Sequence, residues 1–405
     1  GEEVSRNVYD PTNLTLSERY RFGRKVMGYS FNAQGQLASF TDGNGKTTTL
    51  GNYKRGIPQS IGYPDATAQT LNVDDFGQIA AITNQAGATT SYGYDAIGRL
   101  ARIDYPAGDA VAWAPKTFQY SYVGPARGVN GNHWVRLVYQ GNKFQRTDFD
   151  AMLRPVMSGT ARASDQAFYV SSRTDYDWKG RKVFASYPVD GAVDLPNLVA
   201  GVATGYDALG RPTSTTQSSE LGNLTTTTQY LSGAAKRVTD PKGNVTTTWY
   251  QVFDQPAYDA VVTVQAPENV LQTIARDVYG NPLSITQGGA GQSVTKTMTY
   301  DSAHRLCRTW EPESGSEILA YDGADNLAWS VSGASFNGPG CGQDQVAETA
   351  RTVRAYDAMN RVTSVVYPTG TAPSTFTSTE SRSKGAGRGA AGLLLKKRTL
   401  RPPMY

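Results

Sequence analysis

β-branched and aromatic residues gather in short stretches along this chain, and Gly, Pro, Asn and Asp lie between the stretches. The Thr-rich stretches TTTWY at residues 246–250 and TKTMTY at residues 295–300 are examples, and they are typical of a pleated strand surface. No capped stretch of helical period is longer than about two turns. The pattern predicts short strands joined by tight turns.

A seven-residue kernel, YDAIGRL at residues 94–100, returns throughout the chain. Its first residue is aromatic in nine of eleven copies, and its second residue is Asp in nine. Such internal repetition indicates that one supersecondary unit is used many times. The eleven copies begin at Phe31, Val73, Tyr94, Phe149, Tyr176, Tyr206, Tyr250, Arg276, Tyr300, Tyr321 and Tyr356.

The fifth residue of the kernel indicates what the repeat does. Four of the five residues that replace Gly there are Asp, His or Asn, which tolerate a positive φ best, and Leu153 is the exception. This pattern predicts a hairpin whose type I turn is followed by a G1 bulge. The Asp at the second position of the kernel can accept hydrogen bonds from the backbone N–H groups that follow it. The fifth residues are Gly35, Gly77, Gly98, Leu153, Gly180, Gly210, Asp254, Gly280, His304, Asp325 and Asn360.

A proline marks the strand that leaves the kernel. Because it has no N–H to donate, it ends the ladder or lies at its edge. Kernel spacings cluster near 21 residues, and we interpret residues 106–148 and 330–355 as intruding loops. One hairpin cannot bury a core, so neighbouring hairpins are expected to stack into a long, coiling antiparallel sheet. The prolines follow the kernels at Tyr105-Pro106, Tyr187-Pro188, Glu311-Pro312 and Tyr367-Pro368.

At residues 94–108 the sequence YDAIGRLARIDYPAG resembles the unit of the YD-repeat or Rhs (rearrangement hot spot) family, roughly YDxxGRLxxxxYPxG. DPKGNVTTTWY at residues 240–250 is similar to the family's segment between repeats. The resemblance covers residues 29–370. It divides the chain into a lead-in at residues 1–28, a repeat region at residues 29–370 and a non-repeat basic tail at residues 371–405.

The resemblance implies an all-β fold in which the coiling sheet forms part of a hollow shell. In bacterial Rhs proteins and insecticidal toxin complexes, such a shell often encloses a C-terminal toxin. The partners implied are a toxin cargo domain and secretion-apparatus or adaptor proteins. The location implied is secreted or at the cell surface, after delivery from the producing bacterium. Teneurins use a similar shell for adhesion, so a cell-surface adhesion or carbohydrate-binding protein is the alternative.

The ends of the chain differ from the family pattern. The first residues, GEEVSRNVYD, contain neither an initiating Met nor a signal peptide, so we expect a fragment of a longer protein. The tail has neither a turn pattern like that of the kernels nor hydrophobic periodicity, and we expect it to be disordered, truncated or frame-shifted. A basic arm that binds nucleic acid is the less favoured interpretation. Residues 380–405 carry a local charge of +6 and the remainder −2, which gives no electrostatic reason for a nucleic-acid partner.

Two cysteines in 405 residues do not make a disulfide framework, and for Cys307 and Cys341 we favour two unpaired thiols over the alternative of a bridge between them. No apolar run reaches the roughly 18 residues that a membrane span needs.

The sequence predicts no catalytic, cofactor-binding or metal-binding residues. The kernel aspartates repeat one environment, whereas a general acid and a general base need two. His304 and Cys307 supply at most two of the three or four ligands of a metal site, and His133 lies apart in sequence. No G-x-S-x-G elbow occurs. A self-processing protease would need a setting like DPxGL, whereas the DPKG at Asp240 continues to Asn244 and predicts a turn.

Two further patterns are favoured as structural. TDGNGKTTT at residues 41–49 lacks the first Gly of a phosphate-binding loop and predicts a hairpin turn. Kernel tyrosines are expected to pack between adjacent hairpins. Packing is likewise favoured over sugar binding for the six tryptophans, which are Trp113, Trp134, Trp178, Trp249, Trp310 and Trp329.

Overall fold

The computed structural model describes residues 3–108, 112–165, 168–368 and 372–376, and these residues form one long β-ribbon. The first part of the ribbon contains β1 (Ser5–Tyr9), β2 (Leu16–Arg21), β3 (Arg24–Phe31), β4 (Leu37–Asp42), β5 (Thr47–Lys54), β6 (Ile57–Gly62), β7 (Ala68–Val73), β8 (Ile79–Thr83), β9 (Thr89–Tyr94), β10 (Leu100–Asp104), β11 (Lys116–Val123), β12 (His133–Gln140), β13 (Lys143–Phe149), β14 (Pro155–Arg162), β15 (Phe168–Tyr176) and β16 (Lys182–Ser186). The second part contains β17 (Val189–Asp190), β18 (Gly201–Tyr206), β19 (Pro212–Ser219), β20 (Gly222–Leu231), β21 (Ala235–Thr239), β22 (Val245–Tyr250), β23 (Val261–Gln265), β24 (Leu271–Arg276), β25 (Pro282–Gly289), β26 (Gln292–Tyr300), β27 (Leu306–Glu311), β28 (Gly315–Tyr321), β29 (Leu327–Ala334), β30 (Thr352–Tyr356), β31 (Val362–Val366) and β32 (Ser374–Thr375). The helices described are single 3-10 turns, η1 (Leu195–Asn197), η2 (Pro267–Asn269), η3 (Gln343–Gln345) and η4 (Glu348–Ala350).

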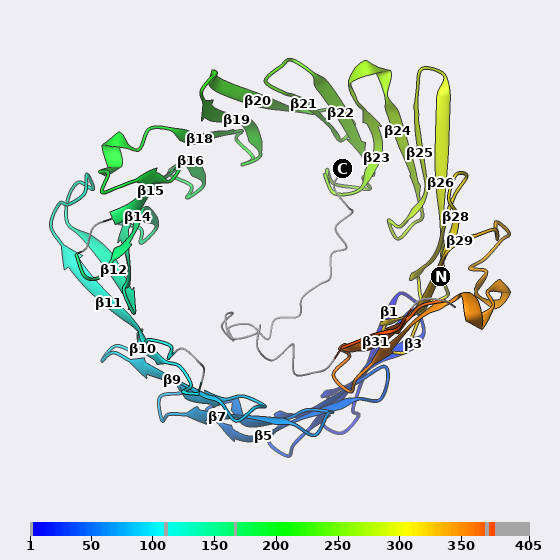
Figure 1. Cartoon of the computed structure of the whole chain (residues 1–405), viewed down its shortest axis with the longest axis horizontal. Helices are drawn as coiled ribbons and strands as arrows, with labels where there is room; N and C mark the ends of the chain where they lie inside the picture. The colour runs from blue at the N-terminus through cyan, green and yellow to red at the C-terminus, as the bar shows by residue number, and fades with distance from the viewer. Residues whose placement is uncertain (1–2, 109–111, 166–167, 369–371, 377–405) are drawn as a thin grey trace.

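Successive strands pair antiparallel, so the sheet is a meander. One departure occurs at β17, which pairs with β15, while β16 pairs with both β15 and β18. The ribbon curls into a ring whose first and last strands lie side by side (Figure 1). The predicted all-β, coiling antiparallel sheet is confirmed.

The meander places consecutive turns on opposite edges of the ribbon. Turns that follow β3, β7, β9, β13, β15, β18, β24, β26, β28 and β30 share one edge, and these are the kernel turns. We call this edge the kernel rim. The opposite rim includes the turns at residues 22–23, 42–45, 63–66, 84–87 and 240–243.

The two predicted loops have different structures. The interpretation of residues 106–148 as a loop is wrong, because β11, β12 and β13 occupy most of it and continue the meander. Their aromatic and β-branched residues favour strands in the same way as those of the repeats. In the second predicted loop, residues 335–351 separate β29 from β30 and contain η3 and η4.

Strands of the sheet lie outside the predicted repeat region, residues 29–370, at both of its ends. Strands β1 and β2 lie within the predicted lead-in at residues 1–28 and pair into the same sheet. Most of the predicted tail at residues 371–405 lies outside the described residues, except for residues 372–376 with β32.

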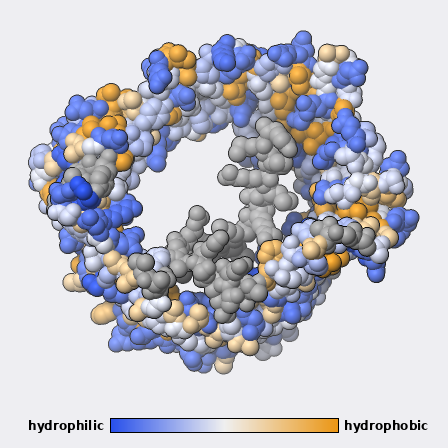
Figure 2. Space-filling model, viewed as in Figure 1, coloured by the Kyte–Doolittle hydropathy of each residue, from blue (hydrophilic) through white to orange (hydrophobic). Residues whose placement is uncertain are grey.

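Buried side chains are few, and they concentrate where irregular segments cover the sheet. We define the first patch as residues 124–132 and 191–197 over β12–β15, and the second patch as residues 335–351 over β27–β29. The irregular segments lie on the outside of the ring in Figure 1, in turquoise and green for the first patch and in orange for the second. Figure 2 shows a hollow in the middle of the ring and hydrophobic side chains in separate clusters around it. The residues buried at these patches include Val135, Phe144, Met157 and Ser171 in the first, and Cys307, Ser316, Ile318 and Val346 in the second.

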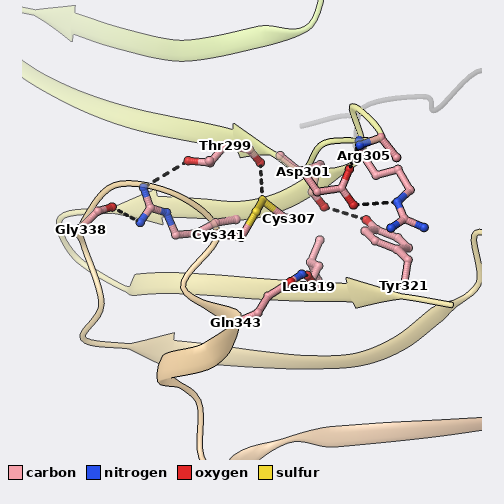
Figure 3. The surroundings of a disulfide bond; sticks show 12 residues. Thr299, Asp301, Arg305, Cys307, Leu319, Tyr321, Gly338, Cys341 and Gln343 are labelled. Atoms are coloured by element: carbon pink, nitrogen blue, oxygen red, sulfur yellow. Dashed lines mark hydrogen bonds and ion pairs between the residues drawn. A yellow bond between two sulfur atoms is a disulfide. The ribbon is translucent and has the colours of Figure 1, made fainter. Parts of the chain in front are cut away.

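The second patch contains a disulfide between Cys307 and Cys341. The expectation of two unpaired thiols is therefore wrong, because the fold of residues 335–351 brings Cys341 back over β27, with the two Cα atoms 5.3 Å apart. Figure 3 shows Cys307 bonded to Cys341, with Gly338 of the same irregular segment close by. Arg308 donates to the carbonyl of Gly338. Sequence spacing alone does not reveal this return of the chain.

Candidate functional site

The kernel turn is the repeated feature from which the ribbon is built. In the turn of Tyr94, the N–H of Gly98 donates to the carbonyl of Asp95 at 2.9 Å, and the N–H of Asp95 donates to the carbonyl of Arg99 at 2.9 Å. The Asp95 carboxylate accepts the N–H groups of Ile97 and Arg99. These bonds close a type I turn followed by a bulge, as predicted.

The predicted left-handed residue is present in ten of the eleven kernels, because their fifth residues have positive φ. Leu153 is one of them, with φ 58°. The kernel predicted at Tyr250 is wrong, since Asp254 is absent from the positive-φ residues and the N–H of Gln251 bonds instead to the carbonyl of Ala260. This segment is a wider loop because Gln251 replaces the short Asp or Asn side chain whose oxygen accepts backbone N–H groups in the other kernels.

In three of the kernels, an arginine connects the turn to the next one. In the turn of Asp150, the Arg154 guanidinium binds the carboxylate, with Nε 2.7 Å from Oδ2. Burial raises the pKa of Asp150, but hydrogen bonds from the Arg154 side chain and backbone outweigh it, so the net pKa lies below the usual value. The same guanidinium donates to the carbonyl of Asp177 at 3.1 Å and lies over the Tyr176 ring, 4.8 Å from its centroid. Arg181 and Arg305 repeat this arrangement toward the kernels that follow them.

Kernel tyrosines connect a hairpin to the one before it, whereas the arginines reach the one after it. The hydroxyl of Tyr94 donates to the carbonyl of Ile79 at 2.9 Å, and the hydroxyl of Tyr206 donates to the carbonyl of Lys182 at 2.8 Å. In each pair the acceptor is the seventh residue of the preceding kernel. The expected packing of these tyrosines between hairpins is confirmed. The other tyrosines that make this bond are Tyr176, Tyr300, Tyr321 and Tyr356.

The first and last parts of the ribbon meet in a contact that we call the coil joint. Here the opposite rim of the first strands meets the kernel rim of the last ones. The Asn44 amide donates to the Asp322 carboxylate at 2.9 Å, and the Asn360 amide donates to the Asp42 carboxylate at 2.8 Å. Arg361 forms an ion pair with Asp65 at 3.2 Å. These partners are 278 to 318 residues apart in sequence, so the ribbon has completed a full turn before it makes this contact.

Aromatic stacking and close backbone contact complete the joint. The Phe22 ring packs against His304, at a centroid distance of 4.0 Å, and against Tyr279, at 5.4 Å, and these two rings lie 4.5 Å from each other. Gly43 and Gly323 approach so closely that a Cβ on either would collide with the other's carbonyl oxygen. The segment interpreted as a hairpin rather than a phosphate loop is confirmed as one, with Gly45 at φ 77°, and its turn forms part of this joint.

The candidate reactive residues occupy structural positions. Within the described residues, no group of three or more His, Cys, Asp and Glu could hold a metal ion. His304 stacks in the coil joint, Cys307 is in the disulfide and His133 is buried in the first patch. Asp240 forms the predicted turn, with Gly243 at φ 86°.

The tryptophans make packing contacts. Trp134 lies beside Tyr122 at a centroid distance of 5.6 Å, and Arg351 lies over the Trp329 ring at 4.4 Å. Trp178 lies in a kernel turn and is largely exposed. The described residues contain no helix long and apolar enough to cross a membrane.

Sequence reasoning missed a buried ionic network in the first patch. Asp148 accepts from His133 Nε2 at 3.0 Å and from both Nε and Nη2 of Arg146. His133 Nδ1 lies 3.0 Å from the carbonyl of Gly131. The only available signal was alternation on β13, which places Arg146 and Asp148 on the same face.

A family model for the RHS repeat matches residues 73–110. The chain carries an RHS repeat. This repeat ribbon shares its fold with a region of the Photorhabdus luminescens Tc holotoxin pore structure, at 11% identity and a TM-score of 0.55 over 91% of this chain and 20% of that one. A crystal structure of TcdB2-TccC3 without its hypervariable C-terminal region matches at 10% identity and a TM-score of 0.42, over 92% of this chain and 30% of that one. No curated protein matches the chain.

The family-model match at residues 73–110 confirms the predicted resemblance to the Rhs or YD-repeat family. The RHS-repeat ribbon spans only 20% and 30% of the lengths of these two solved chains.

Proposed function

We propose that this RHS-repeat ribbon is a non-enzymatic segment of the shell of an Rhs-type polymorphic toxin, and that the shell encloses or presents a toxin domain of the parent protein. The observation that supports this proposal is the coil joint. It lets the ribbon pass through a full turn and rest on itself, which makes a wall around a hollow (Figure 2). The kernel aspartates, which would be the candidates for acid–base chemistry, are bound by their own turns.

The proposed partners are the toxin cargo domain and the secretion-apparatus or adaptor proteins of the parent protein. The proposed location is outside the producing bacterium, after delivery. The fold shared with part of a Tc holotoxin pore structure supports this class of assembly. A wall around a hollow also suits a toxin domain that must be kept from solvent until it is released.

The test uses protease protection in the parent polypeptide that contains this ribbon and the sequence that follows it. We expect the segment after the repeats to resist protease in the wild-type protein and to be digested when Gly43→Val and Gly323→Val open the joint. Gly93→Ala is the matched control, because its Cβ would make only an ordinary 3.5 Å contact with Arg102. Equal digestion in all three proteins contradicts an enclosing role.

The non-enzymatic part of the proposal has its own measurement. The purified ribbon is incubated alone and followed by intact-mass spectrometry, and the mass is expected to stay constant. Spontaneous shortening would indicate self-processing. A saturable hit on a glycan array that Trp178→Ala abolishes would instead favour the adhesion alternative.

A further inference from the structure

The disulfide of the second patch has one buried end and one partly exposed end. Cys307 lies on β27 and is 0% exposed, whereas Cys341 lies in the irregular segment and is partly exposed. Cys307 Sγ is 3.3 Å from the carbonyl oxygen of Thr299 on β26 (Figure 3). A thiolate breaks a disulfide by attacking a sulfur that it can reach. Access therefore favours attack at Cys341, with Cys307 as the leaving group.

A buried arginine beside the bridge favours the same exchange. Arg308 follows Cys307 in sequence and donates to Thr299 Oγ1 at 3.2 Å, so the guanidinium and the buried sulfur contact the same residue. Arg308 also donates to the carbonyl of Gly338, which is close in sequence to Cys341. Among the residues that the structure describes, it forms no ion pair with a carboxylate. Because a neighbouring arginine stabilises a thiolate, this cation favours both the incoming thiolate and the sulfur that leaves.

Few contacts other than the bridge hold residues 335–351 on the sheet. In this fully described segment, no backbone hydrogen bond reaches a strand, and the segment's own backbone bonds close the single turns η3 and η4. The Ser316 hydroxyl donates to the carbonyl of Phe336, and the Gln343 amide donates to the carbonyl of Leu319. A segment with so few anchors opens locally while the strands beneath it stay paired. The covalent bond is therefore its main restraint.

We propose that the Cys307–Cys341 bridge is a thiol–disulfide exchange site whose reduction releases residues 335–351 from the outside of the ribbon. A thiol reductant, RSH, attacks Cys341 Sγ as its thiolate. A bond forms between the R sulfur and Cys341, the bond between the two cysteines breaks, and Cys307 leaves with the electron pair and takes up a proton. A second RSH attacks the R sulfur, so that RSSR departs and Cys341 becomes a thiol.

The exchange makes the second patch sensitive to the redox state of its surroundings. Two thiols are oxidised to one disulfide, and the bridge is reduced by two electrons. The patch therefore stays closed where disulfides persist and opens where thiols are kept reduced. This inference rests on the bridge and the irregular segment, and it does not depend on a toxin shell.

Treatment of the purified, natively folded chain with reduced glutathione tests the exchange. Samples are quenched in acid, digested with pepsin and mapped by mass spectrometry. We expect a transient glutathione adduct on Cys341 and none on Cys307, followed by two free thiols. A bridge that is reduced only in urea overturns the proposal, and so does an adduct on Cys307 alone.

Chymotrypsin digestion measures the release. Reduced protein is alkylated with iodoacetamide and freed of reagents before digestion. Cleavage after Phe336 is expected to become at least about tenfold faster than in the oxidised protein, because cleavage follows the population of the open segment. Cleavage after Phe253, which is 78% exposed and lies outside the patch, should keep its rate and serves as the internal control.

A double variant separates the loss of the bridge from the effect of alkylation. Cys307→Ser with Cys341→Ser should be cleaved after Phe336 as fast as the reduced protein, without any reductant. Far-ultraviolet circular dichroism confirms that the ribbon stays folded in each sample. Equal cleavage after Phe336 in the oxidised, reduced and double-variant proteins overturns the release of the segment.

Discussion

Asp148 and Asp150 are two residues apart at the end of β13, and each binds an arginine, but their surroundings differ. Asp148 belongs to the first patch, where its side chain is 2% exposed and also contacts His133. Asp150 belongs to a kernel turn, where its side chain is 22% exposed and also accepts backbone N–H groups. One carboxylate stabilises a single buried network, and the other repeats a bond that many turns share.

The ribbon and the patches are therefore stabilised in different ways. Each kernel turn closes with its own hydrogen bonds, and several turns connect to a neighbour through an arginine and a tyrosine, as Arg154 and Tyr176 do. Loss of one connection leaves many others in place, as expected for a repeat protein whose stability is a sum over neighbours. A patch has no repeats, so loss of one buried group affects the whole patch.

Asp148→Ala is expected to cause the largest loss of stability, about 3–5 kcal/mol, because it leaves buried His133 and Arg146 without their acceptor. Asp150→Ala should cost only about 1 kcal/mol, since its ion pair is partly exposed. Urea unfolding gives both values, and hydrogen exchange locates the change in each variant. Similar losses for the two variants would contradict the distinction between patch and ribbon.

Cys341→Ser should cost about 3 kcal/mol, because the disulfide closes a loop with a sequence separation of 34 residues. The effect should be confined to the second patch. We expect faster hydrogen exchange in residues 335–351 and in β27 and β28, with no change in the turns of the first ten strands. Ser171→Ala, a buried hydroxyl of the first patch, is the control and should accelerate exchange only there. Uniformly faster exchange along the ribbon would show that the patch is not an independent unit.

The sequence carries enough information to place the kernel turns, and the two unusual copies show why. Leu153 is not a residue type suited to positive φ, yet its turn forms because Asp150 and Arg154 are present. Asp254 tolerates positive φ, yet no such turn forms there, because Gln251 replaces the Asp. A side-chain oxygen at the second position, from Asp in most kernels and from Asn32 in the first, therefore determines the turn more strongly than the residue at the fifth.

The patches and the coil joint could not be predicted in the same way. Asn44 meets Asp322 only because the curvature of many hairpins adds up to one full turn, and no local pattern records that sum. Cys307 meets Cys341 because an irregular segment folds back over the sheet. Turn chemistry acts over about five residues, whereas both of these contacts depend on the path of the whole ribbon.

Gly98→Val tests the strength of a single turn and is expected to cost about 1–3 kcal/mol, because it forces a β-branched residue to φ 84°. Gly98→Asn should cost less, since Asn360 occupies the same position at φ 57°. Gly93→Ala, on strand β9 next to this turn, should cause no loss. The melting temperatures of the three variants give the order. An equal loss for Val and Asn would contradict the left-handed requirement at this position.

The smallest expected effect is that of one kernel carboxylate on the pH dependence of stability. The backbone N–H of Arg211 is the main reason that the pKa of Asp207 is lowered, and the Arg211 guanidinium adds to it against burial. A carboxyl whose pKa is lower in the folded state contributes stability above its unfolded pKa of about 3.9, and this stability is lost as pH falls through the folded pKa. Kernel aspartates that share this direction include Asp95, Asp150, Asp177, Asp322 and Asp357.

Asp207→Asn removes one of these titrating groups but keeps an oxygen for the backbone N–H, as Asn84 does in its own turn. The difference in urea midpoint between pH 7 and pH 3 should therefore be slightly smaller in the variant than in the wild type. The two proteins should approach each other in stability as the pH falls toward the lowered pKa of Asp207, because the wild-type carboxyl then loses its charge. Asp254→Asn is the control, since Asp254 forms no kernel turn, and it should leave the pH dependence unchanged. A wild-type ribbon that becomes more stable on acidification would show that turn carboxylates do not govern its acid stability, and the shared role assigned to the kernel aspartates would be wrong.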